Sequence, residues 1–319
     1  MVIQKRKVSY HPAFFLIWQL NFVHHAQSTL ITNRLSNNQL EYFWLGGPWL
    51  SWWATLAYLI IVLKVGPDFM RDRKPYSLKT TIRLYNLLLV AINTYLFVGS
   101  LISFNYGLDF WGCGEALSTR KRHLVLHYGH LFFHTRYLEF FDTFFFILRK
   151  KNSQLSFLHI FHHAIVPSLM YFGLKFHPLP FNSMLPLTNM FVHIIMYAYY
   201  GLATFPEIQK YLWWKKYLTT MQITQFAVLL IQSMQPFVYY AYPECQFPMD
   251  QIYMNIGIAL TFLGLFVSFY RRTYAIKKPI GQDSATRQIK SVAANGARKQ
   301  SISEASRGDF YDSEARKVK

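Results

Sequence analysis

The chain has 319 residues, of which 52% are hydrophobic, 18% aromatic and only 15% charged. Soluble globular proteins carry about a quarter charged residues, and here the charges gather in short clusters between long apolar stretches. This pattern argues against an ordinary soluble domain and predicts an all-α, polytopic membrane protein. The net charge of +18 could suggest nucleic acid as a partner. However, the basic residues lie beside apolar runs and in a polar tail, which is typical of cytoplasmic membrane loops. We therefore expect the lipid bilayer, and no nucleic acid, as a partner.

The N-terminal part of the chain starts with a basic segment, followed by a short apolar run. Polar residues such as Gln19, Asn21, His24 and His25 interrupt this run. We therefore expect no cleavable signal peptide. Residues 10–30 are interpreted as interfacial, within a luminal N-terminal segment that covers residues 1–45.

Seven later segments have the composition of a membrane span, which needs about 20 mostly apolar residues. They are residues 46–65, 84–105, 124–148, 155–174, 182–204, 218–240 and 251–270. Together they predict a membrane domain of seven transmembrane helices at residues 46–270.

Basic residues are concentrated in the loops after the first, third and fifth predicted spans. They are Arg71, Arg73, Lys74, Lys79 and Arg83, then Arg149, Lys150 and Lys151, then Lys210, Lys215 and Lys216. The alternate loops are poorer in Lys and Arg, except for residues 120–122 before the third span. The positive-inside rule then predicts a luminal N-terminus and a cytosolic C-terminus.

Both cysteines fall in loops that this topology places on the luminal side. Cys113 follows the second span and Cys245 follows the sixth. Because the lumen is oxidising, a Cys113–Cys245 disulfide is predicted, with two free thiols as the alternative.

The tail at residues 271–319 is basic and rich in Ser, Ala and Gly, so it is predicted to be disordered and cytosolic. The chain ends in residues 316–319, RKVK. This ending loosely resembles a dilysine-type retrieval signal, which predicts the endoplasmic-reticulum membrane as the location.

Three predicted spans carry polar groups that are costly in a membrane and are therefore functional candidates. They are Arg136, Glu139 and Asp142 in the third span, His159, His162 and His163 in the fourth, and Asn189 and His193 in the fifth. At about 1.5 Å per helical residue, Asp142 and His162 lie about 10–11 Å from the cytosolic span ends. On the same basis, Glu139 and His193 lie about 15–16 Å deep. The three spans thus bring these groups to one level, in the cytosolic half.

The polar groups allow several interpretations. Arg136, Glu139 and Asp142 could form a buried ion network that only holds helices together. The spacing His-x-x-His-His also occurs in membrane di-iron desaturases and hydroxylases, but these carry several such boxes. A second stripe, made of His123, His127, His130 and His134, lies toward the luminal end. Its deepest member is about 22 Å from the cytosolic end, too far to share a metal pair with His162.

Nucleophilic catalysis is the other chemical use of these imidazoles. A neutral imidazole can take an acyl group from a thioester, and a second imidazole nearby can act as base or hydrogen-bond donor. A seven-span receptor is a further class with the same topology. It is disfavoured because the last span lacks an Asn-Pro-x-x-Tyr element and two of the cytosolic loops are very short.

The same residues resemble the fatty-acid elongase family. Residues 158–163 read LHIFHH, residues 136–143 read RYLEFFDT, residues 189–200 read NMFVHIIMYAYY, and residues 219–226 read TTMQITQF after WWKK at 213–216. Residues 66–67 and 74–76 also fit the family's loop after the first span. The match covers about residues 45–275, and four elements in the right order make it specific. The chain departs from the family at Arg136, where Lys is usual, and over residues 111–135.

The resemblance implies a 3-oxoacyl-CoA synthase that condenses an acyl-CoA with malonyl-CoA, without metal or other cofactor. The acyl chain would lie in a tunnel enclosed by the helices. His162 is expected to accept the acyl group, with His193 as its partner from the facing helix, while His159 and His163 position the ring or polarise the carbonyl. Glu139 and Asp142 would orient histidines. Loss of CO₂ from malonyl-CoA leaves an enolate, and the hydrogen-bond donors that stabilise its charge are expected to be His193, Asn189 and Tyr199.

The substrate-binding residues implied by the resemblance also include a basic cytosolic site for the phosphates of CoA. Lys215 and Arg272 are the first candidates, followed by Lys150 and Lys151; cytosolic loops are, however, basic for topology alone. Arg136 and Gln222 complete the set of predicted substrate-binding residues. Another copy of the chain and the other enzymes of the elongation cycle are candidate protein partners.

Overall fold

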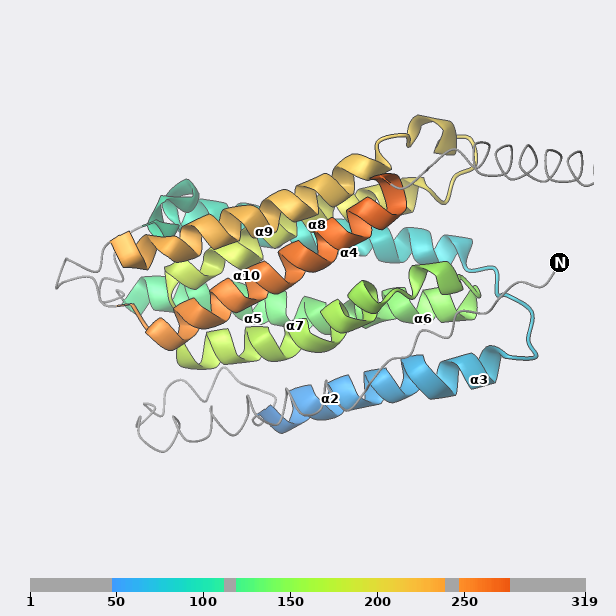
Figure 1. Cartoon of the computed structure of the whole chain (residues 1–319), viewed down its shortest axis with the longest axis horizontal. Helices are drawn as coiled ribbons and strands as arrows, with labels where there is room; N and C mark the ends of the chain where they lie inside the picture. Colours follow the sequence, from blue (N-terminus) through green and yellow to red (C-terminus); the bar gives the residue numbers. More distant parts are fainter. Residues whose placement is uncertain (1–47, 112–118, 239–246, 276–319) are drawn as a thin grey trace, which may run out of the picture. The chain divides into compact units, whose positions relative to one another are not determined.

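The computed structural model describes residues 48–111, 119–238 and 247–275. Every regular element in these ranges is helical, which confirms the all-α prediction (Figure 1). The long helices are α2 (Pro48–Ile60), α4 (Lys79–Ser103), α5 (Thr119–Leu138), α7 (Phe157–Phe176), α8 (Met184–Leu202), α9 (Lys215–Val238) and α10 (Met249–Tyr270). The shorter ones are η2 (Ile61–Val65), α3 (Gly66–Met70), η3 (Asn105–Phe110), α6 (Phe140–Leu148), η4 (Asn152–Gln154), η5 (Pro180–Ser183), η6 (Gln209–Tyr211) and η8 (Arg271–Ala275).

Four helical segments in the described ranges are long and apolar enough to cross a membrane. They are Ser51–Met70, Lys79–Ser103, Phe157–Phe176 and Met249–Tyr274. They are compatible with a polytopic membrane protein. The remaining three predicted spans also form helices, namely α5 with α6, α8 and α9. These helices are not among the four that are long and apolar enough, so a total of seven spans stays a prediction.

The first membrane-length segment is longer than the sequence suggested, because residues 66–67 continue the helix instead of starting a loop. Pro67 has no backbone N–H and so cannot donate to the carbonyl one turn earlier. Immediately before it, Ile61–Val65 forms a π-helical turn, in which the Gly66 N–H donates to the carbonyl of Ile61. This wider turn accommodates the proline, and the helix runs on to Met70 as α3.

The segment predicted as one span at 124–148 consists of two helices that meet at Glu139. Helix α5 ends at Leu138 and α6 begins at Phe140. The Glu139 N–H still donates to the Thr135 carbonyl, whereas the Asp142 N–H donates to the Glu139 carbonyl, three residues back, at 3.1 Å. This tight turn places the Glu139 carboxylate at the joint between two helices.

The largest helix–helix interfaces are α4 with α8 and α9 with α10 (Figure 1). The main apolar cluster joins Phe226 and Leu229 of α9, Ala259 and Phe262 of α10, and Leu169 of α7. Burying such side chains provides the packing that holds polar groups in place within the bundle.

The basic loops after α3 and α6 lie together at one end of the bundle (Figure 1). The Tyr76 N–H donates to the Leu148 carbonyl at 3.0 Å, and Lys150 Nζ donates to the Arg71 carbonyl at 3.1 Å. These two basic loops therefore lie at the same end of the bundle, as the predicted topology requires.

Several predictions fall outside the described residues. These are the N-terminal segment at 1–45, the Cys113–Cys245 disulfide and the tail from residue 276 onward, including its C-terminal signal.

Candidate active site

A buried ion pair lies where α5 meets α6. Arg136 is 1% exposed and its Nη2 atom lies 2.7 Å from Oε1 of Glu139, which is fully buried. The Arg136 guanidinium also donates to Asn189 Oδ1 at 2.9 Å and to Thr135 Oγ1 at 2.9 Å, and it lies 4.1 Å above the Phe132 ring. A buried charge is tolerated only when it is paired and hydrogen-bonded in this way.

The same carboxylate holds His193 of α8. Nδ1 of His193 lies 2.9 Å from Oε1 of Glu139. Because a carboxylate can only accept, Nδ1 must carry the hydrogen, and the lone pair is then on Nε2. Nη1 of Arg136 lies 3.5 Å from the same Nδ1, but two donors cannot bond to each other. Glu139 therefore fixes the tautomer of His193 and leaves its Nε2 free for chemistry.

Asp142 on α6 is held by a residue that sequence reasoning did not select. The Tyr197 hydroxyl donates to Oδ2 of Asp142 at 2.8 Å, and Tyr197 is completely buried. Its ring centroid lies 5.5 Å from that of His193, one turn earlier on α8. The spacing of four residues from His193 was the available signal, because it places both side chains on one helical face.

The three histidines predicted as a box lie in the first two turns of α7. Ser156 caps this helix by accepting from the His159 N–H at 3.2 Å. The ring of His163 lies 4.4 Å from that of His159 and 5.1 Å from that of His162, between centroids. The His162 ring lies 6.5 Å from the His193 ring across the α7–α8 gap. The structure thus brings together the histidines of both predicted spans.

His159 is the member of the box with a side-chain hydrogen bond to another helix. Its Nε2 atom lies 2.9 Å from Oγ1 of Thr143 on α6. The same Oγ1 lies 3.0 Å from the hydroxyl of Tyr58 on α2. Tyr58 was not selected from the sequence, because its contact spans 85 residues and depends on helix packing.

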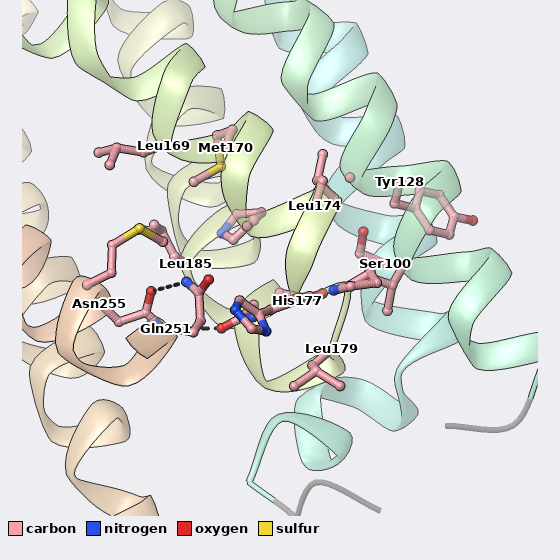
Figure 2. A pocket seen from close by; sticks show the side chains of 18 of the residues that line it. Ser100, Tyr128, Leu169, Met170, Leu174, His177, Leu179, Leu185, Gln251 and Asn255 are labelled. Carbon is pink, nitrogen blue, oxygen red and sulfur yellow. Dashed lines mark hydrogen bonds between the residues drawn. The ribbon is translucent and has the colours of Figure 1, made fainter. Parts of the chain in front are cut away.

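His162 lines a small apolar cavity whose other walls come from α5, α7, α8, α9 and α10. A second, larger cavity adjoins it, since both are bounded by Leu169, Met170, Leu185 and Ile258. Figure 2 shows this second cavity, with His177, Gln251 and Asn255 at one end. There, Gln251 Nε2 donates to Asn255 Oδ1 at 2.8 Å, and Asn255 Nδ2 donates to Asn182 Oδ1 at 3.2 Å. The pocket beside His162 and the pocket with the hydrogen-bonded polar side chains thus share four wall residues.

None of the contacts found for the remaining predicted site residues involves a buried histidine, in the part of the chain that the structure describes. The Tyr199 hydroxyl donates to the Leu212 carbonyl at 3.3 Å, and Gln222 Nε2 lies 3.7 Å from the sulfur of Met196. The basic residues predicted for CoA are exposed; they are Lys150, Lys151, Lys215 and Arg272. Lys215 is the first residue of α9. Arg272 lies in η8, within a unit separate from the residues up to Tyr270.

The second histidine stripe lies along α5. Its two members nearest Arg136, His130 and His134, have ring centroids 4.5 Å apart, while the His127 ring packs against Tyr128 at 5.0 Å. Within the part of the chain that the structure describes, no three His, Cys, Asp or Glu side chains are grouped as a metal ion would require.

An all-helical chain with membrane-length helices is compatible with a polytopic membrane protein, and this one holds a buried cluster of histidines and carboxylates. A model of the GNS1/SUR4 family, also called ELO, matches residues 43–282. The chain belongs to this family of fatty-acid elongases, which confirms the resemblance drawn from its motifs.

Relatives of the chain include three proteins named very long chain fatty acid elongases. Elongase 7 of Drosophila melanogaster is 36% identical over 271 residues, covering 84% of this chain and 79% of the relative. Elongase 4 of Homo sapiens is 36% identical over 259 residues, which is 79% of each protein. Elongase 5 of Tachysurus fulvidraco is 36% identical over 247 residues, covering 76% of this chain and 82% of the relative.

Proposed function

We propose that this protein is the condensing enzyme of fatty-acid elongation, a very-long-chain 3-oxoacyl-CoA synthase. It would join a long-chain acyl-CoA with malonyl-CoA to give 3-oxoacyl-CoA, CO₂ and CoA. The observation that carries the proposal is the position of His162, which borders an apolar cavity and faces His193 across the α7–α8 gap. The very long chain fatty acid elongases among its relatives support the same activity.

The first half of the proposed reaction transfers the acyl group to the protein. A ring nitrogen of neutral His162 attacks the thioester carbonyl, so that a C–N bond forms and the C–S bond breaks. The CoA thiolate leaves and takes up the proton that the imidazole gives up. His193 is suited to carry this proton, since Glu139 holds its Nδ1–H and leaves Nε2 as a base.

The second half uses malonyl-CoA. Loss of CO₂ leaves an enolate, whose α-carbon attacks the carbonyl of the acyl-imidazole. The new C–C bond forms as the C–N bond breaks, which releases 3-oxoacyl-CoA. The His162 imidazolide takes up one proton from solvent, for which Nε2 of His193 can serve as carrier, and His162 is then neutral again. The developing negative charge is stabilised by fixed N–H donors in a site that excludes water. Asn189 lies at the wall of the His162 cavity and is itself fixed by Arg136, which suits this role.

The two adjoining cavities give the acyl chain an apolar path away from His162. His162 and His177 are fifteen residues apart on and just after α7, which corresponds to about 22 Å of helix. Phe226 and Phe262 line the part of the path near His162, and Leu174 and Pro186 line the part farther away. Burial of the apolar chain along this path provides binding energy that does not depend on the CoA group.

The CoA group would bind at the end of the bundle that carries the basic loops. Its phosphates favour exposed cations such as Lys215, Lys150 and Lys151. This end would then be cytosolic, with the N-terminus luminal and the protein in the endoplasmic-reticulum membrane. The proposed chemistry is complete with these side chains and needs no resident metal or cofactor.

The alternative for the Arg136–Glu139–His193 cluster is a purely structural ion network. A structural network predicts that Glu139 variants which fold keep their activity, whereas the proposed mechanism predicts that they lose it. The test uses detergent-purified protein, labelled malonyl-CoA and a panel of long-chain and very-long-chain acyl-CoAs. Formation of labelled 3-oxoacyl-CoA supports the proposal, and no product from folded protein with any acyl-CoA would contradict it.

A further inference from the structure

We propose that Tyr58 and Thr143 form a hydrogen-bond relay that sets the tautomer of His159, so that His159 acts as a hydrogen-bond donor beside the acyl-accepting histidine. Tyr58 and Thr143 are then positioning residues. The proposal of a catalytic role rests on the proposed condensing activity, whereas the tautomer itself is a property of the resting protein.

The relay crosses three helices in the interior of the bundle. The Tyr58 side chain on α2 is 1% exposed, and Thr143 on α6 is fully buried. The Tyr58 hydroxyl lies 3.0 Å from Thr143 Oγ1, which in turn lies 2.9 Å from Nε2 of His159 on α7. The Tyr58 ring also stacks on Phe140, with centroids 4.2 Å apart, which fixes the direction of its hydroxyl.

The direction of the hydrogens follows from what each group can donate. A phenol hydroxyl has one hydrogen, and among the described residues Thr143 is the side chain that bonds to the Tyr58 hydroxyl. A buried hydroxyl that donates to nothing is unfavourable, so Tyr58 donates to Thr143. The single hydrogen of Thr143 is then directed to Nε2 of His159.

His159 must therefore accept at Nε2, and as a neutral ring it carries its hydrogen on Nδ1. In an imidazole the two nitrogens lie on different sides of the ring, so the Nδ1–H points away from Thr143. If His159 donated from Nε2 instead, one hydroxyl hydrogen, that of Tyr58 or that of Thr143, would be without a partner in this chain of three groups. The relay thus decides whether His159 presents a donor or a lone pair to its surroundings.

This choice matters because His159 lies in the same cluster as the acyl-accepting histidine. Its ring lies 4.4 Å from the His163 ring, which lies 5.1 Å from the His162 ring. A donor at Nδ1 can polarise a carbonyl or orient the neighbouring ring, whereas a lone pair would compete for the same proton as His193. Helix α2 would in this way contribute to catalysis without lining the cavity that His162 borders.

The structure offers a matched control for the Tyr58 hydroxyl. The hydroxyl of Tyr137 also links α2 to the α5–α6 segment, by donating to Ser51 Oγ at 2.8 Å, but it does not lead to a histidine. Tyr58→Phe and Tyr137→Phe each remove one buried or half-buried hydroxyl from the same interface. If the hydroxyls only hold the helices together, the two variants should behave alike.

The kinetic test compares these variants in the condensation assay. Tyr58→Phe should lower kcat about tenfold, the loss expected from one misdirected hydrogen bond, and leave KM unchanged. Tyr137→Phe should keep the kcat of the wild type. The two tyrosine variants should have similar midpoints of thermal unfolding. Should Tyr58→Phe not fold, Thr143→Ser, which keeps the hydroxyl, should retain the kcat that Thr143→Val loses. Equal kcat values for the two tyrosine variants, or for the two threonine variants, would overturn the catalytic role.

The tautomer can be tested without activity. With ¹⁵N-labelled histidine and His159→Gln for assignment, the NMR shifts of the wild type should show His159 protonated at Nδ1. In Tyr58→Phe the shifts should move toward a mixture of the two tautomers. A wild-type His159 protonated at Nε2 would overturn the relay even if the condensing activity is present. If the wild type shows no condensing activity in any assay, the proposed function is contradicted. The NMR measurement then still tests the relay by itself.

Discussion

Glu139 and His193 share a hydrogen bond of 2.9 Å, and the same carboxylate oxygen lies 2.7 Å from Arg136. One oxygen thus pairs with a guanidinium and orients an imidazole. The planar group of Arg136 uses its further N–H donors on Asn189 and Thr135. A lysine would keep the charge but could not hold both neighbours in a fixed fork geometry. Arg136 therefore ties Asn189 to the histidine site.

Glu139→Gln tests the orienting role of this carboxylate. The amide can present its NH₂ group to His193, which would favour the wrong tautomer and remove the partner of Arg136. We expect kcat to fall roughly 10²–10⁴-fold, as for loss of acid–base assistance. Asp68→Asn serves as the control, because Asp68 forms an exposed pair with Lys64. Wild-type kcat in folded Glu139→Gln would show that the cluster is only structural.

Tyr197→Phe tests the support of Asp142. The change removes the hydroxyl that donates to Oδ2 at 2.8 Å and leaves a buried carboxylate oxygen without that bond. Loss of a partner from a buried polar group is expected to destabilise the protein by about 1–3 kcal/mol. Thermal unfolding in detergent measures this, with Tyr253→Phe as the control because Tyr253 is 61% exposed. Equal unfolding midpoints for the two variants would contradict a supporting role of Tyr197.

Sequence patterns selected many of the buried polar residues that the structure brings together, because these residues recur at helical spacing. His159, His162 and His163 were selected within one span, and Glu139 and His193 were placed at nearly the same depth by helical rise alone. In the structure, Glu139 and His193 share a hydrogen bond, which agrees with the similar depth predicted for them. The estimate of depth needed only the helical rise and the assumption that the spans end at the same membrane boundary.

The parts that the sequence did not predict depend on packing or on local backbone geometry. The contact of Tyr58 with Thr143 requires α2 to pack beside α6, which no periodicity indicates. Tyr199 was selected among several tyrosines on α8, although Tyr197 is the one that contacts the site. The break at Glu139 occurs without a nearby Pro or Gly, the usual signals of a helix end. The π-helical turn before Pro67, in contrast, has a direct cause in the missing N–H of proline.

Gly173→Leu tests the proposed path of the acyl chain. Gly173 lines the larger cavity, and a Cβ atom placed on it would meet no atom within 4 Å. The Cβ atom of a leucine therefore fits there, and the rest of its side chain should fill part of the cavity. We expect the accepted acyl-CoAs and the products to become shorter, while the shortest substrates keep their kcat.

Gly264→Leu is the matched control for this change. Gly264 on α10 also has open space around its Cβ position, but it does not line either cavity. Its product lengths, measured by mass spectrometry, should equal those of the wild type. A product profile that is the same in Gly173→Leu as in Gly264→Leu would place the acyl chain elsewhere.

Lys215→Ala tests the basic end of the bundle as the CoA site. Lys215 is exposed at the start of α9, so its removal should leave folding intact. We expect KM for acyl-CoA or malonyl-CoA to rise about fivefold, the effect of about 1 kcal/mol from an exposed charge pair. Added salt should raise the KM of the wild type more than that of the variant.

Arg122→Ala removes an exposed cation from the segment just before the third predicted span and should leave KM unchanged. An unchanged KM in Lys215→Ala would remove Lys215 from the CoA site.

The central claim is that His162 accepts the acyl group during condensation. The most direct measurement is incubation of purified wild type and His162→Ala with acyl-CoA alone, followed by mass spectrometry of the intact protein and its peptides, and then with labelled malonyl-CoA. The account predicts an acyl adduct on the peptide that contains His162 and labelled 3-oxoacyl-CoA from the wild type, and neither from folded His162→Ala. Labelled product from His162→Ala at the rate of the wild type would contradict the account.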